Sequence, residues 1–220
     1  MGKVVLKYSV QLVVIIVGIS VAIWLNKLND TFKEKKREVL VLESFIVDLE
    51  SDIENYEFYQ IPVNNNYLKE VNELIYILKT ENYEHDSLQY FLTEFIDFSN
   101  WTLRANTYES LKSGGDLDII SNLEIRQGVT TLYEFISEQS KFVVNMNFAH
   151  RQRIENYLIE HTGYYSNNKT LELKNLQDPR FINLLVIWSD LMTERLRDYQ
   201  QVLETSRSLK KQILEELDSM

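Results

Sequence analysis

The side chains best suited to chemistry in this chain are three histidines and several paired acids. His85, His150 and His161 are far apart, and none belongs to an H-E-x-x-H pair. The chain has no cysteine, so thiolate zinc sites and disulfides are excluded. Asp48 and Asp52 share a helix face, but with 33 acidic residues in the chain we expect a solvated surface. No nucleophile-elbow motif is present. The sequence therefore assigns no catalytic, metal-binding or cofactor-binding residue, and we expect a protein that is not an enzyme.

One segment, YESLKSGGDLDIISN, has a spacing that could form a binding turn. Its pattern is carried by Tyr108, Ser110, Leu111, Ser113, Gly114, Gly115, Leu117, Ile120 and Asn122. In one interpretation, the serine hydroxyls and the amides of the glycine pair bind an anion. In the other, the glycines end one helix, the apolar residues enter the core and Asn122 caps the next helix. The neighbouring Asp116 and Asp118 favour this second, structural interpretation.

The element that dominates the chain is an apolar run near its start. Residues 8–25 carry no charge, and Lys7 and Lys27 flank them. At 1.5 Å per residue, a helix over these residues is roughly 27 Å long, close to the thickness of a bilayer's hydrocarbon core. A cleaved signal peptide is the main alternative, but the run is too long and no A-x-A-like site follows it. The sequence therefore predicts a single transmembrane helix, with residues 1–27 as the anchor in the lipid bilayer.

One face of this anchor is suited to self-association. Gln11, Gly18 and Ala22 recur at steps of seven and four. A small-xxx-small pair lets two helix backbones approach closely, and a glutamine can hydrogen-bond across the contact. This face predicts pairing between two copies of the helix.

Beyond the anchor, the apolar pattern becomes a heptad. The positions are Leu25, Leu28, Phe32, Val39, Leu42, Ile46, Leu49, Ile53 and Tyr56, with Lys35 as the exception. This spacing predicts that the anchor continues as one helix to about residue 60, where Pro62 ends or kinks it. We expect residues 28–61 to form a juxtamembrane stalk.

The remaining residues, 62–220, predict an antiparallel helical bundle that packs on the stalk. Helices are expected at 63–79, near 88–95, at 106–113 and from Asn122 to about residue 162, with a last helix that starts at Asp178-Pro179. Gly163 is the expected stop of the long helix, and Ser87 the cap of the short one. No pair of strands with hairpin chemistry is evident. The fold class is therefore all-α.

Charge is distributed unevenly along the chain. Residues 1–38 hold seven Lys/Arg and three Asp/Glu, a net of +4, and residues 39–220 hold sixteen and thirty, a net of −14. An acidic domain repels a phosphate backbone, so we expect no nucleic acid partner. More positive charges follow the anchor than precede it, which favours a cytoplasmic location for the domain after it. The short basic N-terminus, in contrast, resembles the cytoplasmic start of a signal anchor, in which case the domain is translocated across the membrane.

Two blocks resemble a known family. The run VVIIVGISVAIWLNKLND, residues 13–30, looks like the family's anchor, and residues 108–122 are similar to its Y-x-S-L-K-S-x-G-x-L-x-x-I-x-N motif. Asp48-Leu49-Glu50 and Asp52 extend the likeness. The family is an uncharacterised, domain-of-unknown-function family of N-terminally membrane-anchored helical proteins, frequent in Bacteroidetes. The resemblance implies a single-pass protein of the bacterial inner membrane, with the soluble domain in the periplasm, and it implies no reaction.

The functional expectation is a membrane-anchored scaffold or interaction protein. It would act through a homo-oligomer or through a membrane protein partner, because the heptad is continuous with the anchor and catalytic clusters are missing. The alternative is a membrane-tethered sensor that binds a small ligand between bundle helices. A membrane-bound hydrolase is the least favoured class.

Overall fold

The computed structural model describes the backbone of residues 2–82, 88, 96–161 and 177–220, and side chains from Ile15 onward within those ranges. This part of the chain is all-α and contains no strand. Its elements are α1 (Gly2–Asn55), η1 (Tyr56–Gln60), α2 (Ile61–Lys79), α4 (Asn106–Gly114), η2 (Leu117–Ile119), α5 (Leu123–Thr130), η3 (Thr131–Ile136), α6 (Ser137–His161) and α8 (Pro179–Ser219).

The first three elements form one continuous helical rod. Of the two outcomes expected at Pro62, an end or a kink of the helix, the end does not occur, because the chain stays helical to Lys79. What changes before the proline is the hydrogen-bond register: η1 is π-helical, and the Ile61 N–H donates to the Tyr56 carbonyl five residues back. Proline lacks an N–H and clashes with the carbonyl of residue i−4 in a regular α-helix. The π turn relieves this clash by shifting the carbonyls that precede Pro62.

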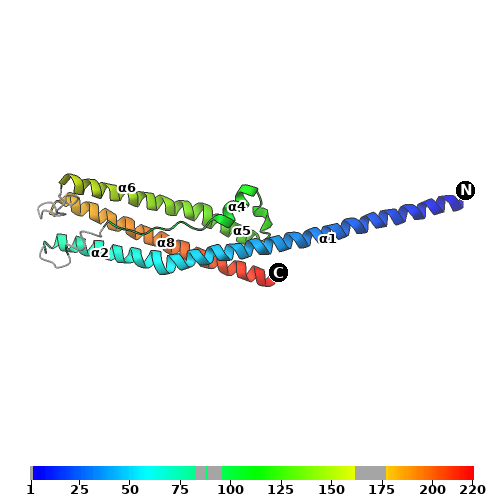
Figure 1. The fold of residues 1–220 in the computed structure, drawn as a ribbon, viewed down its shortest axis with the longest axis horizontal. Helices are drawn as coiled ribbons and strands as arrows, with labels where there is room; N and C mark the ends of the chain where they lie inside the picture. Colours follow the sequence, from blue (N-terminus) through cyan, green and yellow to red (C-terminus); the bar gives the residue numbers. More distant parts are fainter. Residues whose placement is uncertain (1, 83–87, 89–95, 162–176) are drawn as a thin grey trace.

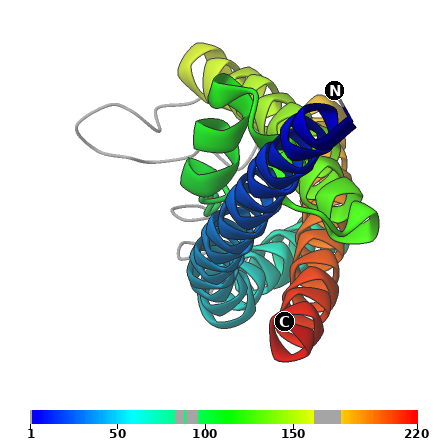
Figure 2. The same cartoon turned by 90° about the vertical axis from the view of Figure 1, so that its right-hand side faces the viewer.

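The rod is the backbone of a three-helix bundle (Figure 1). α8 runs antiparallel to the rod and contacts both α1 and α2, so it spans the junction between them. α6 packs on α8 in the half of the molecule that lies away from the projecting end of α1. Figure 2, which looks along the projecting end of α1, shows α4 and α5 beside the rod. Residues 97–105, here called the crossing segment, form no regular element and run lengthwise along the bundle from its far end toward α4 (Figure 1).

The core lies along one face of α8. Ten of its buried positions recur at alternating steps of four and three: Phe181, Leu185, Trp188, Met192, Arg195, Tyr199, Val202, Ser206, Leu209 and Ile213. This is the repeat expected of a helix that packs along its whole length on neighbouring helices. Leu196, Asp198 and Leu203, each next to one of these ten positions, are buried as well. One core cluster joins the second half of α8 to α1 and the α4–α5 region, and the other joins its first half to α2 and α6.

The core begins inside the stretch expected to be a stalk. Leu42, Phe45 and Leu49 of α1 are fully buried, so the second half of α1 is a bundle helix. From Ile15 to Arg37, in contrast, every described side chain is exposed. α1 therefore projects well beyond the bundle (Figure 1).

No helix is apolar over a length sufficient to cross a membrane among the residues searched, which are those the structure describes. The side chains of residues 1–14, and so the first part of the predicted anchor at 8–25, lie outside the described residues.

Local capping chemistry confirms several predicted helix ends. The Asn122 side chain accepts hydrogen bonds from the backbone of Glu124 and Ile125 at the start of α5. The Asp178 side chain accepts from the Arg180 N–H, and α8 starts at Pro179. The long helix predicted from Asn122 is present as α5, η3 and α6 in direct succession. The predicted cap Ser87 and stop Gly163 lie outside the described residues.

Candidate functional site

The segment singled out in the sequence, residues 108–122, forms a tight joint between α4 and α5. Gly115 ends α4 with φ of +72°, a left-handed conformation that glycine adopts without strain. The Gly115 N–H donates to the Lys112 carbonyl and the Asp116 N–H to the Leu111 carbonyl. Ser113 Oγ donates to the Ser110 carbonyl at 3.1 Å. These three donors are thereby used inside the helix cap.

The apolar residues of the joint enter the core. Ile120 is fully buried and Leu111 is 7 % exposed, while Leu117 packs partly buried against the same cluster. Tyr108 is buried and stacks on Tyr133 of η3, with ring centroids 5.4 Å apart. These contacts are the ones expected if the segment joins two helices and packs its apolar residues in the core.

A small polar network closes the outer side of the joint. The Tyr108 hydroxyl donates to Glu134 Oε1 at 2.6 Å, and the Lys112 ammonium pairs with the same oxygen at 2.7 Å. The Lys112 ammonium, with help from the Tyr108 hydroxyl, holds the pKa of the Glu134 carboxyl below its usual value. This network ties α4 to η3.

The far end of the joint is fastened to α1 and α8. Glu38 Oε1 of α1 accepts hydrogen bonds from the backbone N–H and the hydroxyl of Ser121, both at 2.7 Å. Asn122 Nδ2 donates to Glu216 Oε2 of α8 at 2.6 Å. Arg37, the last residue of the fully exposed part of α1, pairs with Asp116 at 2.6 Å. The joint therefore lies where the projecting part of α1 enters the bundle.

The expectation that Asp48 and Asp52 form a solvated surface is wrong. Asp52 is fully buried and Asp48 is 8 % exposed. Asp52 accepts from Trp101 Nε1 at 2.9 Å and from the Arg104 N–H, and Asp48 accepts from the N–H and hydroxyl of Thr107. These carboxylates cap the crossing segment and the first turn of α4 from another helix, which the sequence of α1 alone does not reveal.

The predicted self-association face lies on the projecting part of α1. Gly18 and Ala22 are exposed there, and a Cβ added at Gly18 would meet no atom within 4 Å. The side chain of Gln11 lies outside the described residues. Nothing in the bundle thus occupies the described part of this face.

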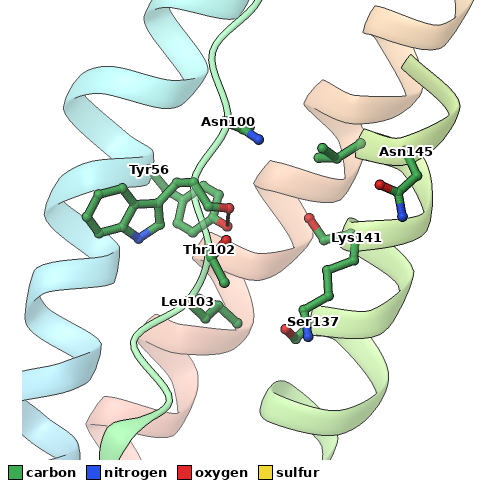
Figure 3. Close-up of a pocket in the computed structure, with 10 residues that line it drawn as sticks. Tyr56, Asn100, Thr102, Leu103, Ser137, Lys141 and Asn145 are labelled. Atoms are coloured by element: carbon green, nitrogen blue, oxygen red, sulfur yellow. Dashed lines mark hydrogen bonds between the residues drawn. The ribbon is translucent and has the colours of Figure 1, made fainter. Parts of the chain in front are cut away.

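A cavity of about 220 Å³ opens between the crossing segment and the first turns of α6 (Figure 3). Its lining residues are Tyr56, Asn100, Trp101, Thr102, Leu103, Ser137, Ser140, Lys141, Val144 and Asn145. The side chains of Asn100, Lys141 and Asn145 lie in the gap between these two walls (Figure 3). Ser137 and Ser140 are each 8 % exposed. Because their hydroxyls hydrogen-bond to no described residue, they can serve a bound molecule.

The sequence reasoning missed a buried arginine beside this region. Arg195 of α8 is fully buried, its guanidinium lies 3.8 Å from the ring centre of Phe98, and no described residue accepts a hydrogen bond from it. Burial lowers the pKa of Arg195 to about 10, so the group keeps its charge at neutral pH. The available signal was its place at a heptad position between Met192 and Tyr199.

The histidines do not converge. His150 is buried, and its Nε2 lies 2.8 Å from the Leu184 carbonyl. Burial lowers the pKa of His150, with the nearby Arg153 acting in the same direction. Across the described residues, no group of three or more His, Cys, Asp or Glu side chains is arranged to hold a metal ion.

The chain was compared with protein-family models, with curated proteins and with solved structures, and none of the three comparisons found a match. The functional argument therefore depends on the sequence and the geometry of this molecule.

Proposed function

We propose that this chain is a single-pass, membrane-anchored scaffold protein that acts by assembling with itself or with a membrane protein partner. One observation carries the proposal: every described side chain of α1 from Ile15 to Arg37 is exposed. These include Ile16, Trp24 and Phe32, which are 54 %, 60 % and 72 % exposed. An isolated helix with this much apolar surface in water is costly, so lipid or another helix must cover it.

Lipid is the proposed cover for residues 8–25. In sequence the run is uncharged and ends at Leu25, and the residue before it, Trp24, is an aromatic residue suited to the membrane interface. The exposed Lys33, Lys35 and Lys36 follow about 12–17 Å further along the helix, where they can reach anionic headgroups. The bundle then starts at Glu38, outside the bilayer.

A second helix is the proposed cover for the face around Gly18 and Ala22. The small side chains leave room for close backbone approach, and Leu28 and Phe32 extend apolar surface toward the bundle. A homo-oligomer would bury this face in identical contacts, and a membrane protein partner would bury it against a different helix.

The proposed location is the inner membrane of a bacterial cell, with the bundle on the periplasmic side. This placement follows from the family resemblance of the anchor and of residues 108–122. Protease treatment of intact spheroplasts tests it: digestion of the bundle without lysis is expected, and protection until lysis would place the bundle in the cytoplasm.

Assembly is tested by measuring the mass of the full chain in detergent and in lipid nanodiscs. A dimer or larger species is expected, and Gly18→Leu should shift it toward monomer, whereas the matched exposed change Ile19→Leu should leave it unchanged. Crosslinking in native membranes separates self-assembly from a different partner. A monomer in both media, with no crosslinked neighbour, would contradict the proposal.

A further inference from the structure

The cavity beside the crossing segment is flanked by unusual helical geometry on both sides. Tyr56, one of its lining residues, is the first residue of the π-helical η1. Ser137, another, directly follows the π-helical η3. These are the two π-helical segments in the described part of the chain. A π turn is less favourable than a regular α turn and is found frequently at functional sites.

The lining of the cavity differs from the acidic molecule as a whole in the charged residues that it contains. None of its lining residues is Asp or Glu, and Lys141 is its one charged residue. The Lys141 ammonium pairs at 2.7 Å with Glu138 and is half exposed, so it lies at the rim with donors to spare. Arg195 adds an uncompensated buried charge on Phe98, two residues before Asn100 in the crossing segment. An anion is the charge type that these groups stabilise.

We infer that this cavity binds a small organic carboxylate. Its volume of about 220 Å³ equals the space of about seven water molecules in the liquid, which suits a ligand of about seven non-hydrogen atoms. The carboxylate would take donors from Lys141, the free serine hydroxyls and the Asn100 amide. The apolar part would lie against Leu103 and Val144, which also line the cavity.

Pentanoate and its uncharged isostere pentanamide are the matched probes, applied to the full chain in detergent and followed by ligand-observed NMR. Pentanoate should bind with a dissociation constant on the order of millimolar. Lys141→Met should weaken pentanoate binding by about fivefold and leave pentanamide unchanged. Lys211→Met, a change at an exposed lysine far along α8 (its side chain is 78 % exposed), is the control and should alter neither.

Ser140→Leu should fill the cavity and abolish binding, while the circular dichroism spectrum stays helical. If the Ser140→Leu variant does not fold, Ser137→Leu serves the same purpose. Three results would each overturn the inference: no pentanoate binding at tens of millimolar, binding that survives the filled cavity, or equal binding of both probes with no effect of Lys141→Met.

Discussion

Three carboxylates of α1, Glu38, Asp48 and Asp52, hold the chain that runs between the crossing segment and α5. Each accepts a backbone N–H from that chain, and two of them also accept a hydroxyl. Such bonds to an ionised acceptor are stronger than neutral ones, and removing the acceptor leaves buried donors unpaired. These acids therefore fix an otherwise irregular stretch against the rod.

Replacing Asp52 tests this role at one residue. Asp52→Ala leaves Trp101 Nε1 and the Arg104 N–H without their acceptor, and we expect the free energy of unfolding to fall by about 1–3 kcal/mol. Urea titration followed by tryptophan fluorescence measures this loss. Glu54→Ala, at an exposed position of the same helix, should change stability little. Equal effects of the two changes would show that the buried bonds contribute nothing.

A buried acid of α8, Asp198, should make the stability of the protein depend on pH. Burial raises the pKa of Asp198, although the Gln139 amide donates to it. The folded chain then keeps this proton to a higher pH than the unfolded chain, so stability falls as pH rises from about 4 through the raised pKa. Asp198→Asn should remove this loss of stability at high pH, because the asparagine amide does not titrate.

The variant should melt about 2–4 °C above the parent at pH 8 for each kcal/mol recovered, and the difference should vanish near pH 4. Thermal melts at both pH values measure it. Asp190→Asn, an exposed change on the same helix, should shift neither melt. A variant that is less stable than the parent by the same amount at both pH values would contradict the assignment.

Single-residue burial was predictable only in part. The heptad of α8 could have placed Arg195 in the core, because it continues the repeat from Met192, three residues before it, to Tyr199, four residues after it. The burial of Asp52 could not be predicted in this way, since it depends on a crossing segment about fifty residues away in sequence. Polar side chains in a core are explained by their tertiary partners, which a helical pattern does not contain.

For the helices, the residues at which they begin could be predicted from local capping chemistry. Changes of the hydrogen-bond pattern inside a helix, from α to π, could not. Asn122 and Asp178 were identified as caps because their side chains satisfy free N–H groups of the next turn. The π turns at Tyr56–Gln60 and Thr131–Ile136 have no comparable sequence signal. Pro62 suggested that the helix ends or kinks there, but not that the chain would shift its hydrogen bonds before the proline and continue as a helix.

The turn between α4 and α5 provides an element-scale prediction. Gly115→Ala places a side chain at φ of +72° and should lower the free energy of unfolding by about 1–2 kcal/mol. Gly114→Ala is the matched control: its φ is not positive, and its Cβ would lie 3.3 Å from Asp116 Oδ2, a side chain that can move. Urea titration of both variants measures the difference. An equal or larger loss for Gly114→Ala would refute the left-handed turn as the reason for the glycine pair.

At the scale of the whole molecule, α8 links two parts of one rod. It packs on α2 and α6 at one end and on α1 at the other, so the bundle and the projecting helix are joined without a flexible linker in the described chain. The all-α fold was predictable from periodicity. The extent of the projection was not, because the apolar heptad continues through the place where the bundle ends.

In the proposed arrangement, the projecting part of α1 lies in lipid while the bundle lies in water. The chain has no cysteine, so a nitroxide can be placed cleanly through Val17→Cys or Val47→Cys, at positions that are 55 % and 61 % exposed. In lipid vesicles, collisions of each label with oxygen and with a water-soluble nickel chelate report its surroundings. We expect the label at position 17 to meet oxygen and exclude nickel, and the label at position 47 to meet nickel. Free access of nickel to both labels would show that the projecting part of α1 does not lie in lipid.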